Sequence, residues 1–195
     1  MVSGRGGDGV ALPALDPVLA HDGPWTLDDL DVLGDAMRWA EIVDGALVMA
    51  PPPAEPHNVA LLRLGHVLED ARPADLVVSA NGHLQTPTSY RSPDLLVYPR
   101  VRMPQTGGVR AEDVVLAVEV MSRGSVTTDR ITKLHEYAAA GVAGYWRVEL
   151  EPVPLIVVYG LRDGVYVELA TVHGDETYDA VEPFPVTISP SALLV

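Results

Sequence analysis

The sequence has no cysteine among its 195 residues, a single phenylalanine, and one lysine, Lys133. Without cysteine the chain can form neither a disulfide scaffold nor a thiolate zinc site. Positive charge is also scarce, because 13 Lys and Arg stand against 27 Asp and Glu, for a net charge of −14. This balance argues against non-specific nucleic-acid binding through a broadly basic surface.

Long apolar runs are missing as well. No stretch of membrane-spanning length is free of charge, Gly and Pro, and residues 1–9 lack the basic start and apolar run of a secretory signal. We therefore expect a cytoplasmic protein that does not associate with membranes. With 48% hydrophobic residues, the chain is long enough for one core, and we expect a single domain over residues 25–195 after a flexible, Gly-, Pro- and Asp-rich leader over residues 1–24.

The acidic residues concentrate at the two ends of the chain. Residues 1–35 contain one Arg and seven Asp, and residues 149–195 contain one Arg and eight acidic residues. The middle is therefore nearly neutral, and a polyanion could approach it, although it has no basic stripe of the kind found in strong DNA binders.

Apolar periodicity predicts many strands and two substantial helices. Thr26 is a candidate N-cap for a short helix through about Leu33, and Asp44-Gly45 and Asp163-Gly164 each predict a tight hairpin. We expect helices over residues 57–71 and from Thr127 or Thr128 to Gly141, and strands over 38–43, 46–49, 75–80, 94–98, 114–121, 145–150, 155–159 and 165–171. The order indicates an α/β or α+β fold with one central mixed sheet flanked by helices.

Three carboxylates occupy unusual positions in this pattern. Glu119 interrupts the nearly continuous apolar run 114–121, where a carboxylate is costly unless it is paired or binds a metal. Asp94 follows Pro93 at the start of a strand, which is also ordinary turn chemistry. Glu41 lies in the first hairpin, on the face of Trp39 and Val43, and fits either an edge position or a site. A structural ion pair would explain any one of these acids alone.

Lys133 is the only ammonium group in a chain with twelve Arg. A compact point charge suits the approach to a phosphate or a nucleophilic water, which favours a functional role. The alternative is a solvated lysine paired with Asp129 one turn earlier. We expect Lys133 to flank Tyr137, outside an apolar stripe formed by Ile131, Leu134 and Ala138.

Other catalytic patterns are absent from the sequence. The histidines fit no metal-binding spacing such as H-E-x-x-H, although His57, at the start of a helix, could contact a phosphate or simply cap the turn. There is no G-x-S-x-G elbow and no Gly-rich phosphate loop after a strand. Serine hydrolase, kinase and dehydrogenase functions therefore have no support.

Taken in order, these segments resemble the Uma-type restriction endonuclease family of the PD-(D/E)XK nuclease superfamily. The resemblance covers roughly residues 25–195. It is carried by Glu41-Ile42-Val43-Asp44-Gly45, Ser92-Pro93-Asp94, Val118-Glu119-Val120-Met121-Ser122, Asp129-Arg130, Lys133-Leu134, Tyr137, Gly141-Val142 and Tyr145-Trp146.

The resemblance implies a restriction-endonuclease-like core with a divalent metal, Mg²⁺ or Mn²⁺. By position, Asp94 matches the Asp of the PD motif, Glu119 the second acid and Glu41 an upstream Glu, and the three are the implied metal ligands. The lysine expected two residues after the second acid is replaced by Met121, and the matching cation is Lys133 on the following helix. The chain departs from the family pattern at residues 122–125 and 148–150.

These implications predict a metal-dependent endonuclease that hydrolyses DNA, with Glu41, Asp94, Glu119 and Lys133 as its catalytic residues. The alternative is a nuclease fold without turnover that serves as a protein-interaction module. A purely structural sheet protein is a third possibility, in which Glu119→Gln would be neutral or stabilising. The resemblance also suggests a homodimer.

Overall fold

The computed structural model describes residues 21–33, 40–49, 52–121 and 128–194. Most of the expected leader, residues 1–20, therefore lies outside the described residues, as do Arg38, Trp39 and the loop at 122–127. The division into a leader and one domain stays a prediction. None of the helices in the described ranges is both long and apolar enough to cross a bilayer.

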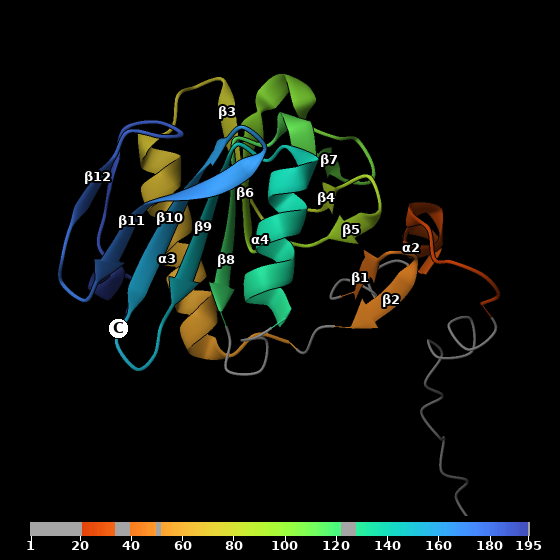
Figure 1. Cartoon of the computed structure of the whole chain (residues 1–195), viewed down its shortest axis with the longest axis horizontal. Helices are drawn as coiled ribbons and strands as arrows, with labels where there is room; N and C mark the ends of the chain where they lie inside the picture. Colours follow the sequence, from red (N-terminus) through yellow and green to blue (C-terminus); the bar gives the residue numbers. More distant parts are fainter. Residues whose placement is uncertain (1–20, 34–39, 50–51, 122–127, 195) are drawn as a thin grey trace, which may run out of the picture.

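A six-stranded mixed sheet forms the centre of the molecule (Figure 1), as the sequence predicted. Strands β8 and β9 are parallel, and every other neighbouring pair in this sheet is antiparallel. In spatial order the sheet contains β11 (Val165–His173), β10 (Leu155–Arg162), β9 (Gly144–Glu149), β8 (Leu116–Met121), β6 (Leu95–Pro99) and β3 (Leu76–Ala80).

A second, five-stranded sheet accompanies the first, whereas the sequence predicted only one. Several of its strands have two or three residues, which is too short for an alternating pattern to be visible in a sequence. In spatial order it contains β2 (Ala46–Met49), β1 (Ala40–Val43), β5 (Ser89–Arg91), β4 (Leu84–Gln85) and β7 (Val109–Arg110). A separate hairpin of β12 (Tyr178–Ala180) and β13 (Val186–Ile188) was also not predicted.

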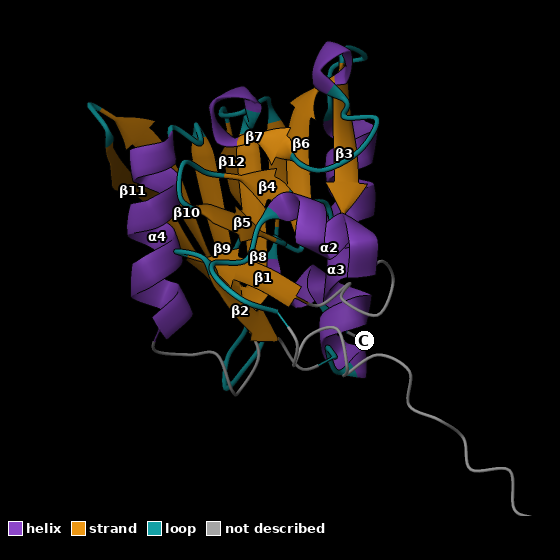
Figure 2. Ribbon diagram, turned by 90° about the vertical axis from the view of Figure 1, so that its right-hand side faces the viewer, coloured by secondary structure: helices purple, strands orange, loops and turns teal. Residues whose placement is uncertain are grey.

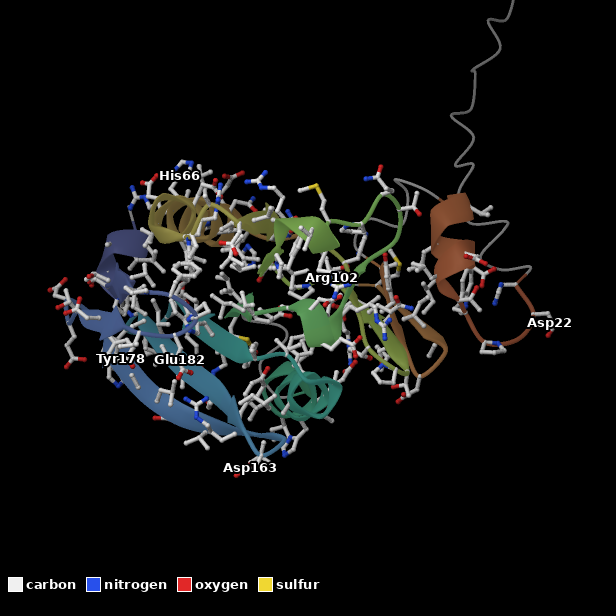
Figure 3. The ribbon with its side chains drawn as sticks, turned by 90° about the horizontal axis from the view of Figure 1, so that it is seen from above. Asp22, His66, Arg102, Asp163, Tyr178 and Glu182 are labelled. Atoms are coloured by element: carbon white, nitrogen blue, oxygen red, sulfur yellow. The ribbon has the colours of Figure 1, made fainter. Side chains whose placement is uncertain are left out.

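Two long helices cover opposite faces of the central sheet. Helix α3 (Glu55–Ala71) buries Leu64 and Leu68 against one face. Helix α4 (Thr128–Ala140) covers the other, and Gly141 follows it with φ +88°, a left-handed conformation that ends a helix readily at glycine. Figure 3 shows the arrangement from above, with His66 on the α3 side of the sheet.

Turn and cap residues define the local structure much as predicted. In the β1–β2 hairpin, Asp44 has φ +49° and Gly45 has φ +79°, as a type I′ turn requires, and the β10–β11 hairpin repeats this conformation. Helix α2 (Leu27–Leu33) begins after Thr26, whose backbone N–H and hydroxyl both donate to the Asp29 carboxylate, at 2.8 and 2.6 Å. The Asp29 carboxylate thereby satisfies the backbone N–H of the residue that precedes this very short helix.

The expected apolar stripe of α4 is wrong in one respect. Ile131 is 61% exposed, whereas Lys133 and Tyr137 are buried together with Ala138. Tyr137 packs in the apolar core beside Tyr145, and both Tyr137 and Lys133 contact Glu119 of β8, so this side of the helix faces the sheet. The β1–β2 hairpin lies beside the same helix (Figures 1 and 2).

Candidate active site

Glu41, Glu119 and Lys133 come from three different elements and are in direct contact. The Lys133 ammonium nitrogen lies 2.9 Å from Oε1 of Glu119 on β8 and 3.2 Å from Oε1 of Glu41 on β1. All three side chains are buried, and Lys133 is only 6% exposed. The solvated lysine considered from the sequence is therefore excluded, and the cation joins the two sheets and α4 at one point.

Asp94 stands directly before β6 and is tied to the strand that carries Glu119. Its Oδ2 accepts a hydrogen bond from the backbone N–H of Val120 at 2.7 Å, one residue beyond Glu119. Strands β6 and β8 are neighbours in the central sheet, which places the two acids at the same end of adjacent strands. The structure thus brings together all four residues that the sequence singled out. Their catalytic roles stay predictions.

Burial and neighbouring charge change the acidity of Glu119. Burial is the main cause that raises its pKa to about 7, and the charges of Asp94 and Glu41 act in the same direction against the lowering effect of Lys133. The hydroxyl of Tyr137, on α4, donates to Glu119 Oε1 at 2.9 Å. A carboxyl group with such a pKa is held in a site where a further positive charge would be strongly favourable.

Glu41 behaves in the opposite way although it shares the same lysine. Burial raises its pKa, but Lys133, the backbone N–H of Ser92 and Arg91 together outweigh this and lower it. Ser92 donates to Oε1 at 3.1 Å, and Arg91 donates to Oε2 at 3.0 Å. Both oxygens of Glu41 are therefore engaged by donors of the protein itself.

Arg91 is a site residue that sequence reasoning missed. It lies at the end of β5 and is 4% exposed, and its guanidinium spans Glu41 and Glu136 of α4, with 2.9 Å between Nε and Glu136 Oε2. Nothing in the sequence distinguishes it from eleven other arginines except its place three residues before Asp94. It cross-links the smaller sheet to α4.

His57 is the second residue whose role only the structure reveals. From the first turn of α3, its Nε2 lies 3.2 Å from Asp94 Oδ2, and its Nδ1 is buried without a hydrogen-bond partner among the described residues. Burial lowers the pKa of His57, but the hydrogen bond and the charge of Asp94 outweigh it, so the net pKa is raised. His57 therefore holds Asp94 from the α3 side rather than capping the helix.

The donor set fits a hard divalent cation. Asp94 Oδ1 and Glu119 Oε2 have no hydrogen-bond partner in the part of the chain that the structure describes, while the other oxygen of each carboxylate is fixed by protein donors. Mg²⁺ commonly uses one or two carboxylates and completes its shell with water and phosphate. No group of three His, Asp or Glu side chains close enough to hold a metal ion exists among the described residues, so any ion here would rely on such outside ligands.

Charge counting supports the same conclusion. Four carboxylates face two cationic side chains, which leaves an excess of two negative charges before His57 is considered. The carboxylates are those of Glu41, Asp94, Glu119 and Glu136, and the cations are Lys133 and Arg91. One divalent cation would neutralise this excess, and the charges of Asp94 and Glu41 add to burial in raising the pKa of Glu119.

This combination of a mixed sheet, two acids at the ends of adjacent strands and a buried lysine defines a restriction-endonuclease-like fold. The family described as "Uma2: Putative restriction endonuclease" matches residues 27–193, and the chain belongs to this family, which confirms the resemblance seen in the sequence. No curated protein matches the chain.

A solved structure supports the fold. The crystal structure of "a putative nuclease belonging to DUF820" from Anabaena variabilis ATCC 29413 superimposes with a TM-score of 0.64 at 19% sequence identity. The match covers 87% of this chain and 97% of that chain. At this identity the similarity establishes the fold, and the chemistry has to be argued from the residues of this chain.

Proposed function

We propose that this protein is a nuclease that hydrolyses DNA phosphodiester bonds with the help of Mg²⁺ or Mn²⁺. The observation that carries the proposal is the carboxylate pair of the buried Glu119 and the half-buried Asp94, each with one oxygen fixed and one oxygen without a partner among the described residues. Family membership supports the same class of enzyme. When bound, the divalent ion would activate a water molecule and neutralise charge on the phosphate.

The site residues would have different roles in this reaction. Asp94 and Glu119 would hold the ion, with Asp94 oriented by His57 and by the Val120 amide. Lys133 contacts Glu119, one of these two ligands, and also Glu41, and its ammonium group would stabilise charge that develops on the phosphate oxygens. Such a preorganised donor needs no reorganisation during the reaction.

Glu41 is supported more strongly as a positioning residue than as a metal ligand. Its carboxylate receives Arg91, the Ser92 amide and Lys133, so it fixes the lysine from the side opposite Glu119. The prediction that Glu41 also binds the metal stays a prediction, as does the homodimer.

One observation favours the second candidate, an interaction module without turnover. Lys133 already pairs with both nearby glutamates, and the chain carries a net charge of −14. In such a protein the lysine would simply neutralise buried acids, and neither metal nor DNA would change its stability.

Thermal unfolding with and without millimolar Mg²⁺ or Mn²⁺ separates the two candidates. A nuclease site should raise the midpoint in a concentration-dependent way, because an ion that binds only the folded state stabilises it. Asp94→Ala should abolish the rise, and Glu112→Ala, which removes an exposed acid paired with Arg110, should leave it unchanged. If the wild-type midpoint does not respond to either ion, the nuclease proposal is wrong.

Cleavage assays complete the test. Single-stranded and double-stranded DNA would be incubated with the metal-loaded wild type and with Glu119→Ala and Lys133→Ala. Metal-dependent cleavage that both substitutions abolish supports the proposal. Cleavage that survives Glu119→Ala would locate the chemistry elsewhere in the chain.

A further inference from the structure

Arg147 lies in the strand next to Glu119 and on the same face of the central sheet. The parallel register of β8 and β9 pairs Glu119 with Arg147. Tyr145, two residues earlier on β9, packs edge-on against Tyr137 of α4, which shows that this face of β9 is the one that α4 and Glu119 share. Asp94 approaches β8 from β6 on the other side, so β8 separates it from Arg147.

The guanidinium of Arg147 is only partly used by the protein. Its Nε donates to Oε1 of Glu149 at 3.1 Å and its Nη1 donates to the hydroxyl of Tyr159 at 3.2 Å. Nη2 has no hydrogen-bond partner within the described ranges. Since arginine carries five N–H donors in a planar fork, donors remain for a ligand.

Tyr159 adds a further donor at the same place. Its oxygen accepts the hydrogen bond from Arg147, and its own O–H hydrogen is then left to point toward an acceptor. A fork of guanidinium N–H groups beside a phenolic O–H matches the oxygens of a phosphodiester anion.

The other cations near the carboxylates are already committed. Lys133 contacts two glutamates, and Arg91 likewise spans Glu41 and Glu136. Their side chains are 7% and 5% exposed, compared with 17% for Arg147. Arg147 is therefore the more accessible positive group beside the proposed ion and faces a single described carboxylate, that of Glu149.

We propose that Arg147, with the hydroxyl of Tyr159, forms a subsite for a second phosphodiester group of the nucleic acid, next to the one that reaches Asp94 and Glu119. The inference rests on the proposed nuclease function and specifies how the strand is held. Strands β6 and β9 are two strand spacings apart, about 10 Å, so the two phosphate groups would lie along the ends of β6, β8 and β9. In this arrangement Glu149 competes with the phosphate for Arg147 and limits its affinity.

The test compares DNA binding by Arg147→Gln and Glu149→Gln, measured by fluorescence anisotropy with a short labelled duplex and a single strand across a salt series. Arg147→Gln should weaken binding about 5- to 20-fold and reduce the salt slope by about one, as expected for one lost phosphate contact. Glu149→Gln should leave affinity unchanged or raise it, because it releases the guanidinium. A purely structural salt bridge predicts weaker binding in both variants, and that result would overturn the subsite.

The controls separate this inference from the nuclease proposal itself. Arg162→Gln removes an arginine that is also paired with a glutamate, Glu182, but lies at the other end of β10, and it should not change binding. The midpoint increase with Mg²⁺ should persist in Arg147→Gln, because the carboxylates are intact. If that variant does not fold, Arg147→Lys, which keeps the charge but loses the fork, should show the weaker binding instead.

Two results count against Arg147 in different ways. A wild type that responds to metal and binds DNA, with Arg147→Gln binding equally well, overturns the subsite and leaves the nuclease proposal in place. A wild type that responds to neither metal nor DNA overturns both.

Discussion

Glu119 and Glu41 share one lysine, yet the structure predicts that their neutral replacements change stability in opposite directions. In the metal-free protein, burial raises the pKa of Glu119 from its usual 4.5 to about 7. Between these values the unfolded chain loses the proton while the folded chain keeps it. The carboxyl group therefore makes folding less favourable as the pH rises from about 4.5 to 7, and the penalty stays constant above that.

The size of the effect follows from the two pKa values. Each pKa unit of difference corresponds to about 1.4 kcal/mol, so the penalty approaches about 3 kcal/mol above pH 7 and changes by about 2 to 3 kcal/mol between pH 5 and pH 8. Glu119→Gln keeps an oxygen for the Tyr137 hydroxyl and leaves Lys133 paired with Glu41. We therefore expect the free energy of unfolding of Glu119→Gln, minus that of wild type, to increase by about 2 to 3 kcal/mol between pH 5 and pH 8.

Glu41→Gln supplies the contrast. The pKa of Glu41 is lowered, so its ionised form stabilises the fold at every pH above its unfolded value, and this contribution is lost only as the pH falls through the folded value. Its replacement should destabilise the protein at both pH 5 and pH 8, by similar amounts, because Arg91 and Lys133 each lose a partner.

Urea unfolding of EDTA-treated protein at both pH values measures these differences. The charged and titratable groups that interact with Glu119 are those of Asp94, Glu41, Lys133, Tyr137, Tyr145 and His57, and all are present in both Gln variants except the one replaced. A stability difference between Glu119→Gln and wild type that does not vary with pH would refute the reasoning, since Glu119 would then be ionised in the folded protein throughout the range.

Three further substitutions test the packing around the site by the same urea method. Arg91→Met leaves the buried carboxylate of Glu41 and the half-buried carboxylate of Glu136 without their shared cation and should cost about 3 to 5 kcal/mol, whereas a cost below about 1 kcal/mol would show that the pairs are solvated. Tyr137→Phe removes the hydroxyl that donates to Glu119 and should cost about 1 to 2 kcal/mol; no loss at pH 8 would contradict the hydrogen bond. Leu64→Ala empties a fully buried position on α3 and should cost about 2 to 5 kcal/mol, and a smaller loss would mean that the helix is loosely packed.

The fold could be predicted where local chemistry decides the structure. The dipeptides at 44–45 and 163–164 specify their hairpins because few other residues adopt two successive positive φ values, and the helices at 57–71 and 128–140 follow from periodicity and from Gly141. The second sheet could not be predicted. Its strands β4, β5 and β7 are held by pairing with distant segments, and two or three residues carry no periodic signal.

Some residues of the candidate site could also be predicted from the sequence, and others could not. Glu119 was visible because an acid inside an apolar strand is costly, and Lys133 because it is the only lysine. Arg91 was not recognised, and the contact of His57 with Asp94 was not foreseen, since an exposed arginine or histidine would look the same in the sequence. The rotation of α4 was missed for a related reason, because the burial of Lys133 depends on its contact with Glu119 of β8, which helical periodicity does not reveal.

The distribution of partners among the cations also limits how this chain can bind DNA. Within the candidate site, Lys133 and Arg91 are bound to carboxylates, so Arg147 is the cation best placed there to displace counterions from the nucleic acid. In a plot of the logarithm of DNA affinity against the logarithm of salt concentration, each phosphate contact contributes about −0.9 to the slope. A chain that relies on Arg147 and a bound ion should therefore show a slope of only about −1 to −2. A slope as steep as about −5 would mean that several further cationic side chains contact the phosphates. The shallow slope in turn implies weak non-specific affinity, so the bound ion and the shape of the site, rather than bulk electrostatic attraction, must supply most of the productive binding.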